Sequence, residues 1–204
     1  NPSGFSSILA NPTVTNLLTT TTFTATYSYP GFTCTGQASV TVTVNPKPVM
    51  TSPNSKSICS NTNVNLPLIA DVPSTFSWVA TANGNVTGES TSAQTGSSIN
   101  DVLTNTTSSN QTVVYTVTPT SSTGSCVGNP QTVNVTVYPS PTVSNATFNQ
   151  GGPYCSGASA NAINNFTSNI ALATFNWTSS DEIGFGTSGT GNIPAYTANN
   201  NTTA

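Results

Sequence analysis

Apolar and polar residues alternate in short runs along this chain, and turn-forming residues separate the runs. Val133, Val135 and Val137 point to one face of a run whose other face is polar. This period of two is typical of a half-buried β-strand. The same alternation over residues 113–117, and the turn at residues 121–124 after it, predict that these two strands form a hairpin.

Shorter runs over residues 64–68, 76–79 and 99–103 predict earlier strands. No stretch of about 10 to 12 residues has apolar residues at helical spacing, and Pro and Gly recur too often to permit a helix. The pattern therefore predicts an all-β fold of immunoglobulin-like sandwiches with about seven short strands each.

Two segments are near copies of each other and set the length of a structural repeat. Residues 39–48 (SVTVTVNPKP) recur as residues 132–141 (TVNVTVYPSP), so Pro46 and Pro139 are 93 positions apart. A repeat of this length corresponds to one β-sandwich domain, since solenoid units are only about 20 to 50 residues long.

The period divides the chain into three parts. Residues 1–46 are expected to be the C-terminal part of one repeat, residues 47–140 a complete repeat, and residues 141–204 the N-terminal part of the next. We therefore expect this chain to be a piece of a longer protein.

Alternating prolines mark both joints between the expected repeats, at Pro46, Pro48, Pro139 and Pro141. Proline fixes φ and favours extended geometry, so each joint should be short and stiff. Tandem sandwiches connected in this way are expected to form an extended rod.

Aromatic residues supply the expected structural core. Trp78 and Trp177 each lie two residues after a phenylalanine, on the expected third strand, where such sandwiches place a core tryptophan. Tyr115 lies on a later strand. The alternative is a sugar-stacking platform, formed by Trp78 or by the loop aromatics Phe185 and Tyr196.

Charge is scarce, at 3% of residues with two Lys or Arg and no His. Binding to nucleic acid needs clustered basic side chains, and a Ser-His nucleophile needs histidine, so both classes are excluded. The sequence has no apolar run long enough to span a membrane. A composition dominated by Thr, Ser, Asn, Val and Gly indicates a secreted, extracellular β-protein.

The few acids form two candidate pairs, Glu89 with Asp101 and Asp181 with Glu182. Two carboxylates suffice for glycoside hydrolysis, and clustered carboxylates bind calcium. Loop carboxylates that face water are much commoner, so we expect no catalytic, cofactor or metal site and no enzyme activity.

Four cysteines, Cys34, Cys59, Cys126 and Cys155, allow three pairings. Each full repeat has one early and one late cysteine, which favours a Cys59–Cys126 disulfide, with the partners of Cys34 and Cys155 expected outside this fragment. A Cys34–Cys59 bond across the joint and four free thiols are the alternatives.

Several motifs give the chain a family resemblance. The tail at residues 41–46 (TVTVNP), the segment at residues 57–60 (SICS), the Phe-x-Trp strand and the turn at residues 124–128 (GSCVG) resemble PKD-like repeats of giant surface adhesins of Bacteroidota, of the SprB gliding-motility type. The resemblance implies export by type IX secretion, partners in the gliding machinery, and no catalytic residues.

The leading hypothesis is a non-catalytic stalk segment of a secreted cell-surface adhesin or filament. Its expected partners are neighbouring repeats, surface glycans or other copies in a filament, with no nucleic acid. The alternatives are a carbohydrate-binding module and the spacer of a secreted hydrolase.

Overall fold

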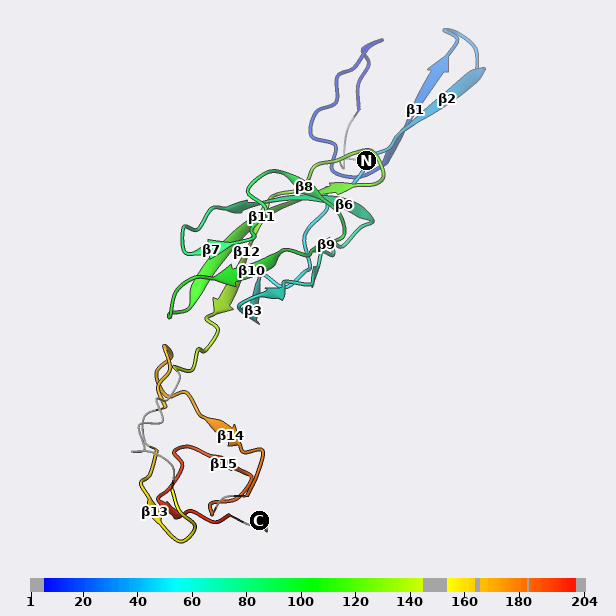
Figure 1. Ribbon diagram of the computed structural model, residues 1–204. Coiled ribbons are helices and arrows are strands. Elements are labelled where there is room, and N and C mark those ends of the chain that lie inside the picture. Colours follow the sequence, from blue (N-terminus) through cyan, green and yellow to red (C-terminus); the bar gives the residue numbers. More distant parts are fainter. Residues whose placement is uncertain (1–5, 145–153, 164–165, 183, 201–204) are drawn as a thin grey trace.

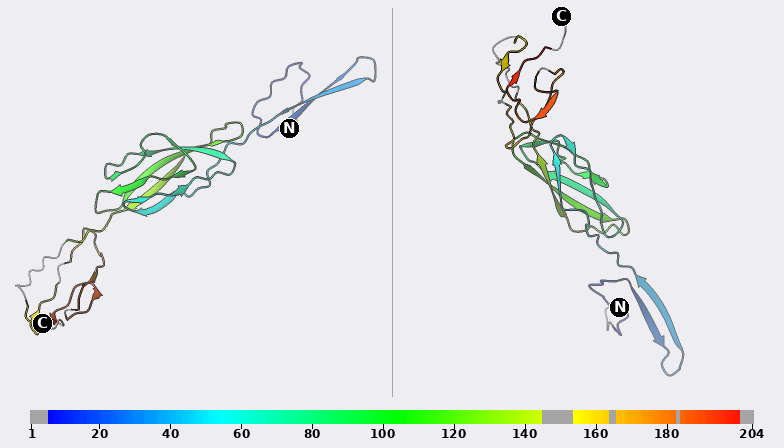
Figure 2. Two further views of the ribbon diagram at one scale, coloured as in Figure 1. Left: turned by 45° about the vertical axis from the view of Figure 1, so that its right-hand side comes forward. Right: turned by 90° about the horizontal axis from the view of Figure 1, so that it is seen from below.

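The computed structural model describes residues 6–144, 154–163, 166–182 and 184–200. Every regular element in these residues is a β-strand, which confirms the all-β prediction. No helix capable of crossing a membrane occurs in this part of the chain. Three groups of strands follow one another along an elongated molecule, with the N-terminal hairpin and the C-terminal strands at opposite ends (Figures 1 and 2).

The central group is a β-sandwich. Its larger sheet has five strands in the order β3-β12-β11-β6-β8, in which β3 is parallel to β12 and the other pairs are antiparallel. The opposing layer consists of a three-stranded sheet, β4-β10-β7, and the two-stranded pair β5-β9. The bounds are β3 (Ser55–Cys59), β4 (Thr62–Asn63), β5 (Leu66–Pro67), β6 (Ser74–Thr81), β7 (Val86–Thr87), β8 (Gln94–Thr95), β9 (Ser98–Ile99), β10 (Val102–Asn105), β11 (Gln111–Ser121) and β12 (Gln131–Tyr138).

The core of this central sandwich follows directly from the period-two pattern. Alternate residues of β11 and β12 point inward, and all of these inward side chains are fully buried from Val113 to Val117 and from Val133 to Val137. The opposing layer contributes Leu66, Ile99 and Leu103 to the same cluster. The sequence prediction of an immunoglobulin-like sandwich is thus confirmed for this group.

The N-terminal group is a single hairpin of β1 (Thr21–Ser28) and β2 (Thr35–Val42). Phe23 and Val40 are the repeat equivalents of Tyr115 and Val133. Phe23 pairs with Val40 just as Tyr115 pairs with Val133, so the hairpin has the same register as β11 and β12. The described residues of this group contain no second sheet against its inner face.

The C-terminal group repeats the strand pairings of the other half of the sandwich. Its strands are β13 (Ser159–Ala160), β14 (Asn176–Thr178), β15 (Ser188–Thr190) and β16 (Tyr196–Thr197). Trp177 of β14 pairs with Gly189 of β15 as Trp78 of β6 pairs with Gln94 of β8. The N-terminal group therefore has counterparts of β11 and β12, and the C-terminal group has counterparts of the earlier strand pairs of the central sandwich.

Candidate functional site

The joint that precedes the central sandwich is built from the prolines and from the turn between β11 and β12. Pro48 is fully buried, and its carbonyl oxygen lies against Gly128. A Cβ on Gly128 would approach that oxygen to 2.2 Å, so a side chain at this position would push the joint open. The Gly128 N–H also donates to the carbonyl of Pro119 at 2.9 Å, which fixes the turn on β11.

The residues on either side of the buried proline are fixed as well. The side chain of Asn45 lies over Gly124, whose φ of +73° is readily available to glycine. After the prolines, the Val49 N–H donates to the Asp71 carboxylate at 2.8 Å, and the Asp71 N–H donates back to the Val49 carbonyl at 3.0 Å. The joint therefore has a defined direction as it enters the sandwich.

The joint that follows the central sandwich has a different set of contacts. The Asn169 carboxamide accepts from the Thr142 N–H at 2.7 Å and donates to the Ser140 carbonyl at 3.3 Å. Pro139 is half-buried, and Pro141 is exposed. One side chain of the C-terminal group thus bridges the chain around the second proline.

The predicted core aromatics are packed within the protein. Trp78 is 7% exposed, and the edge of its ring lies against Gly96, where a Cβ would be 3.2 Å away. Trp177 is half-buried and meets the ring of Phe185 edge-on at 5.2 Å, while Phe185 meets Tyr196 at 4.6 Å. Trp177, Phe185 and Tyr196 thus form a chain of edge-on ring contacts, as in a small apolar core, while Trp78 belongs to the buried cluster of the central sandwich.

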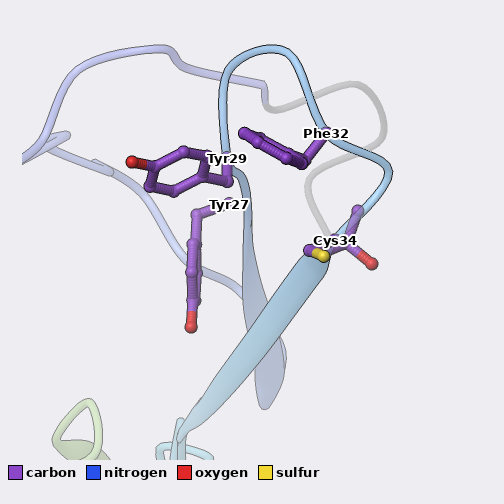
Figure 3. Close-up of a pocket in the computed structure, with 5 residues that line it drawn as sticks. Tyr27, Tyr29, Phe32 and Cys34 are labelled. Carbon is purple, nitrogen blue, oxygen red and sulfur yellow. The ribbon is translucent and has the colours of Figure 1, made fainter.

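The tip of the N-terminal hairpin carries an aromatic hollow that the sequence reasoning missed. Tyr27, Tyr29 and Phe32 line a space of about 510 Å³ together with Cys34 and Thr35 (Figure 3). The rings of Tyr29 and Phe32 meet edge-on at 5.3 Å, and all three aromatic side chains are largely exposed. Three aromatic residues within six positions are the signal that could have identified this site.

The candidate acid pair Glu89 and Asp101 is engaged in structural hydrogen bonds. The Asp101 carboxylate accepts from the Ser90 N–H at 2.7 Å, from the Ser90 hydroxyl at 2.8 Å and from the Tyr115 hydroxyl at 2.8 Å. Glu89 accepts from the Asn83 N–H at 3.1 Å. Burial raises the pKa of the Tyr115 phenol, and its hydrogen bond to Asp101 raises it further.

The second acid pair lies in an exposed loop of the C-terminal group. Glu182 accepts from the Gly184 N–H at 2.7 Å and from the Gly186 N–H at 3.0 Å. The hydrogen bonds from Gly186 and Gly184 lower the pKa of Glu182, because they favour its charged form. Within the described ranges, three or more His, Cys, Asp or Glu side chains do not gather into a group suited to a metal ion.

The disulfide expected between Cys59 and Cys126 is not formed, and all four cysteines are free thiols. The strand order gives the reason. Cys59 ends β3 and pairs in register with Tyr138 at the C-terminal end of β12, whereas Cys126 precedes the N-terminal end of the same strand. Eight residues of strand separate these ends by about 25 Å, which is beyond disulfide reach.

Comparison with protein families identifies the class of the central sandwich. Residues 56–141 match the PKD-like domain. The match begins in β3 and ends at the second joint, so it covers the buried strands described above. PKD-like domains are typically non-catalytic and usually extracellular. No curated protein matches this chain.

Proposed function

We propose that this chain is a non-catalytic stalk segment of a large secreted cell-surface adhesin or filament. In this proposal residues 47–140 are a complete PKD-like repeat, residues 1–46 the late strands of the repeat before it, and residues 141–204 the early strands of the repeat after it. The segment extends and presents whatever lies at its end.

The observation that carries this proposal is the pair of joints. Proline, a buried turn and the Asn169 bridge connect successive strand groups with few residues between them. The elongated arrangement in Figure 2 and the PKD-like match support the same function. The structural roles of Asp101 and Glu89 also support a role without catalysis.

A finer assignment rests on the family resemblance. We infer that the parent protein is an adhesin of the SprB gliding-motility type, exported by type IX secretion and partnered by the gliding machinery. Neighbouring repeats and surface glycans are the contacts that such a segment would make.

Small-angle X-ray scattering on the chain tests the stalk function. The expected result is an elongated particle whose maximum dimension does not change when calcium is added or removed. A compact, folded-back particle would overturn the proposal.

Carbohydrate binding is the second candidate, and the aromatic hollow favours it. Exposed rings such as Tyr29 and Phe32 can stack on the apolar faces of sugars. A glycan array tests this function, with Tyr29→Ala as the variant and Tyr138→Ala as the control at another exposed tyrosine. Binding that Tyr29→Ala alone removes would support the module, and silence across the array would reject it.

A further inference from the structure

The two cysteines of the central sandwich lie at its opposite ends, one at each joint. Cys126, the late cysteine of the repeat, lies in the turn before β12, and that turn packs on the first joint through the contact of Gly128 with Pro48. Cys59, the early cysteine, ends β3 beside Tyr138, the last residue of β12 before the second joint. Because the two cysteines cannot reach each other, a partner for either one has to come from a neighbouring repeat.

The turn that carries the late cysteine contacts the end of the repeat before it. The Cys126 sulfur lies 3.7 Å from the carbonyl oxygen of Asn45, and the Asn45 side chain lies over Gly124 in the same turn. Since Pro46 and Pro139 are equivalent prolines of the repeat, Asn45 is the equivalent of Tyr138. The late cysteine of one repeat is thus placed against the last strand residue of the preceding repeat.

The early cysteine of a repeat lies beside this same residue. In the central sandwich Cys59 pairs in parallel register with Tyr138, and the Ser60 N–H donates to the Tyr138 carbonyl oxygen at 2.8 Å. The Cys-Ser sequence recurs at residues 155–156, so it belongs to the repeat. In the preceding repeat, the early cysteine is therefore expected beside Asn45.

We infer that a disulfide connects consecutive repeats across each joint, from the early cysteine of one repeat to the late cysteine of the next. Neighbouring strands are about 4.8 Å apart, and a disulfide spans about 4.4 to 6.8 Å between Cα atoms. Two cysteines that both lie against Asn45 meet this requirement. The inference rests on the proposed function, because it requires further repeats on both sides of this chain.

This pairing accounts for the four free thiols of the chain. Cys126 and Cys34 are late cysteines, whose partners are the early cysteines of the repeats before theirs. Cys59 and Cys155 are early cysteines, whose partners are the late cysteines of the repeats after theirs. All four partners then fall outside residues 1–204, so the chain by itself has no pair to join.

Bond formation needs an oxidant, and a small disulfide such as oxidised glutathione supplies it. The Cys126 thiolate attacks that disulfide and releases one reduced thiol. The thiolate of the early cysteine of the preceding repeat then attacks the mixed disulfide, closes the bond to Cys126 and releases the second reduced thiol. The two cysteines lose two electrons and two protons in total, and the oxidant gains both. A second covalent connection beside the prolines restricts bending at the joint.

Peptide mapping of the unreduced full-length protein that contains this chain tests the pairing. After alkylation, the peptide with Cys126 should be linked to one from the preceding repeat, and the peptide with Cys59 to one from the following repeat. A Cys59–Cys126 link, or alkylation of both residues as free thiols, would overturn the inference.

Variants of the full-length protein add a matched control. Cys126→Ser should leave one additional thiol free for iodoacetamide, in the preceding repeat, and should retain the link of Cys59. Ser122→Ala, at an exposed residue of the same turn, should leave both links intact. Loss of the Cys59 link in Cys126→Ser would show a different pairing and overturn the inference.

The joint geometry can be tested in the chain itself. Asn45→Cys places a thiol beside Cys126, so the two should form a bond within one chain in a glutathione buffer. Thr43→Cys is the control, at an exposed position two residues earlier, and should form no such bond. Absence of the bond in Asn45→Cys, or equal bonding in Thr43→Cys, would overturn the geometry on which the pairing depends.

The staple and the stalk function fail separately. An elongated particle whose cysteines are not linked across the joints would overturn the staple and leave the stalk function standing. A compact particle in scattering would overturn the stalk function whatever the links.

Discussion

The phenol of Tyr115 donates a 2.8 Å hydrogen bond to the carboxylate of Asp101 and so connects the two layers of the central sandwich. Tyr115 lies on β11 in the five-stranded sheet, and Asp101 lies between β9 and β10 in the opposing layer. The Ser90 loop shares the same carboxylate, so one acid holds together three parts of the fold.

Removing this hydrogen bond should lower stability. Tyr115→Phe leaves the ring in place but deprives Asp101 of a donor, so the free energy of unfolding should fall by about 1 to 2 kcal/mol. Urea unfolding of the chain measures the change. Tyr138→Phe, at a 44% exposed tyrosine, is the control and should leave the midpoint unchanged.

Stability should decline at alkaline pH. The pKa of Tyr115 is raised in the folded state, so unfolded chains lose that proton first as pH rises. The contribution is fully present below the unfolded pKa of about 10 and is lost above it. The free energy of unfolding, measured from about pH 8 to 12, should fall less steeply for Tyr115→Phe than for the natural sequence. Parallel curves would contradict this.

Equivalent valines in the two hairpins should respond differently to the same substitution. Val135→Ala removes two methyl groups from the closed core and should cost about 2 kcal/mol. Val42→Ala makes the same change on the open face and should alter stability by less than about 0.5 kcal/mol. Both are measured by chemical denaturation at dilute concentration. Equal effects would mean that the N-terminal face is covered in solution.

The first joint should depend on Gly128. Gly128→Ala forces a Cβ against the Pro48 carbonyl, so the joint must shift and the scattering profile should broaden toward bent particles. Gly84→Ala is the matched control, because a Cβ there meets nothing within 4 Å. A Gly128→Ala profile identical to that of the control would show that the joint does not set the direction of the rod.

All four cysteines should react with iodoacetamide in the folded, unreduced chain at dilute concentration. Cys126 should react more slowly than the other three, because it is half-buried while they are exposed. Mass spectrometry after timed quenching measures both features. Two alkylations in place of four would indicate a bond within the chain.

Much of the central sandwich could be predicted from local pattern alone. Alternation along residues 113–117 and 133–137 determines which side chains point inward, because successive residues of a strand face opposite sides. The aromatic hollow at the hairpin tip was missed, because three neighbouring aromatics on a turn show no periodicity.

The sequence by itself determined the all-β class, the period of the repeat and the inward faces of the strands, since these depend on residues close together in the chain. Only the tertiary structure decided the positions of the cysteines. The parallel pairing of β3 with β12 places Cys59 at one end of the sandwich and leaves Cys126 at the other. The tertiary structure also decided that the same alternating pattern is buried in the central sandwich and exposed in the N-terminal hairpin, because burial depends on which strands lie opposite.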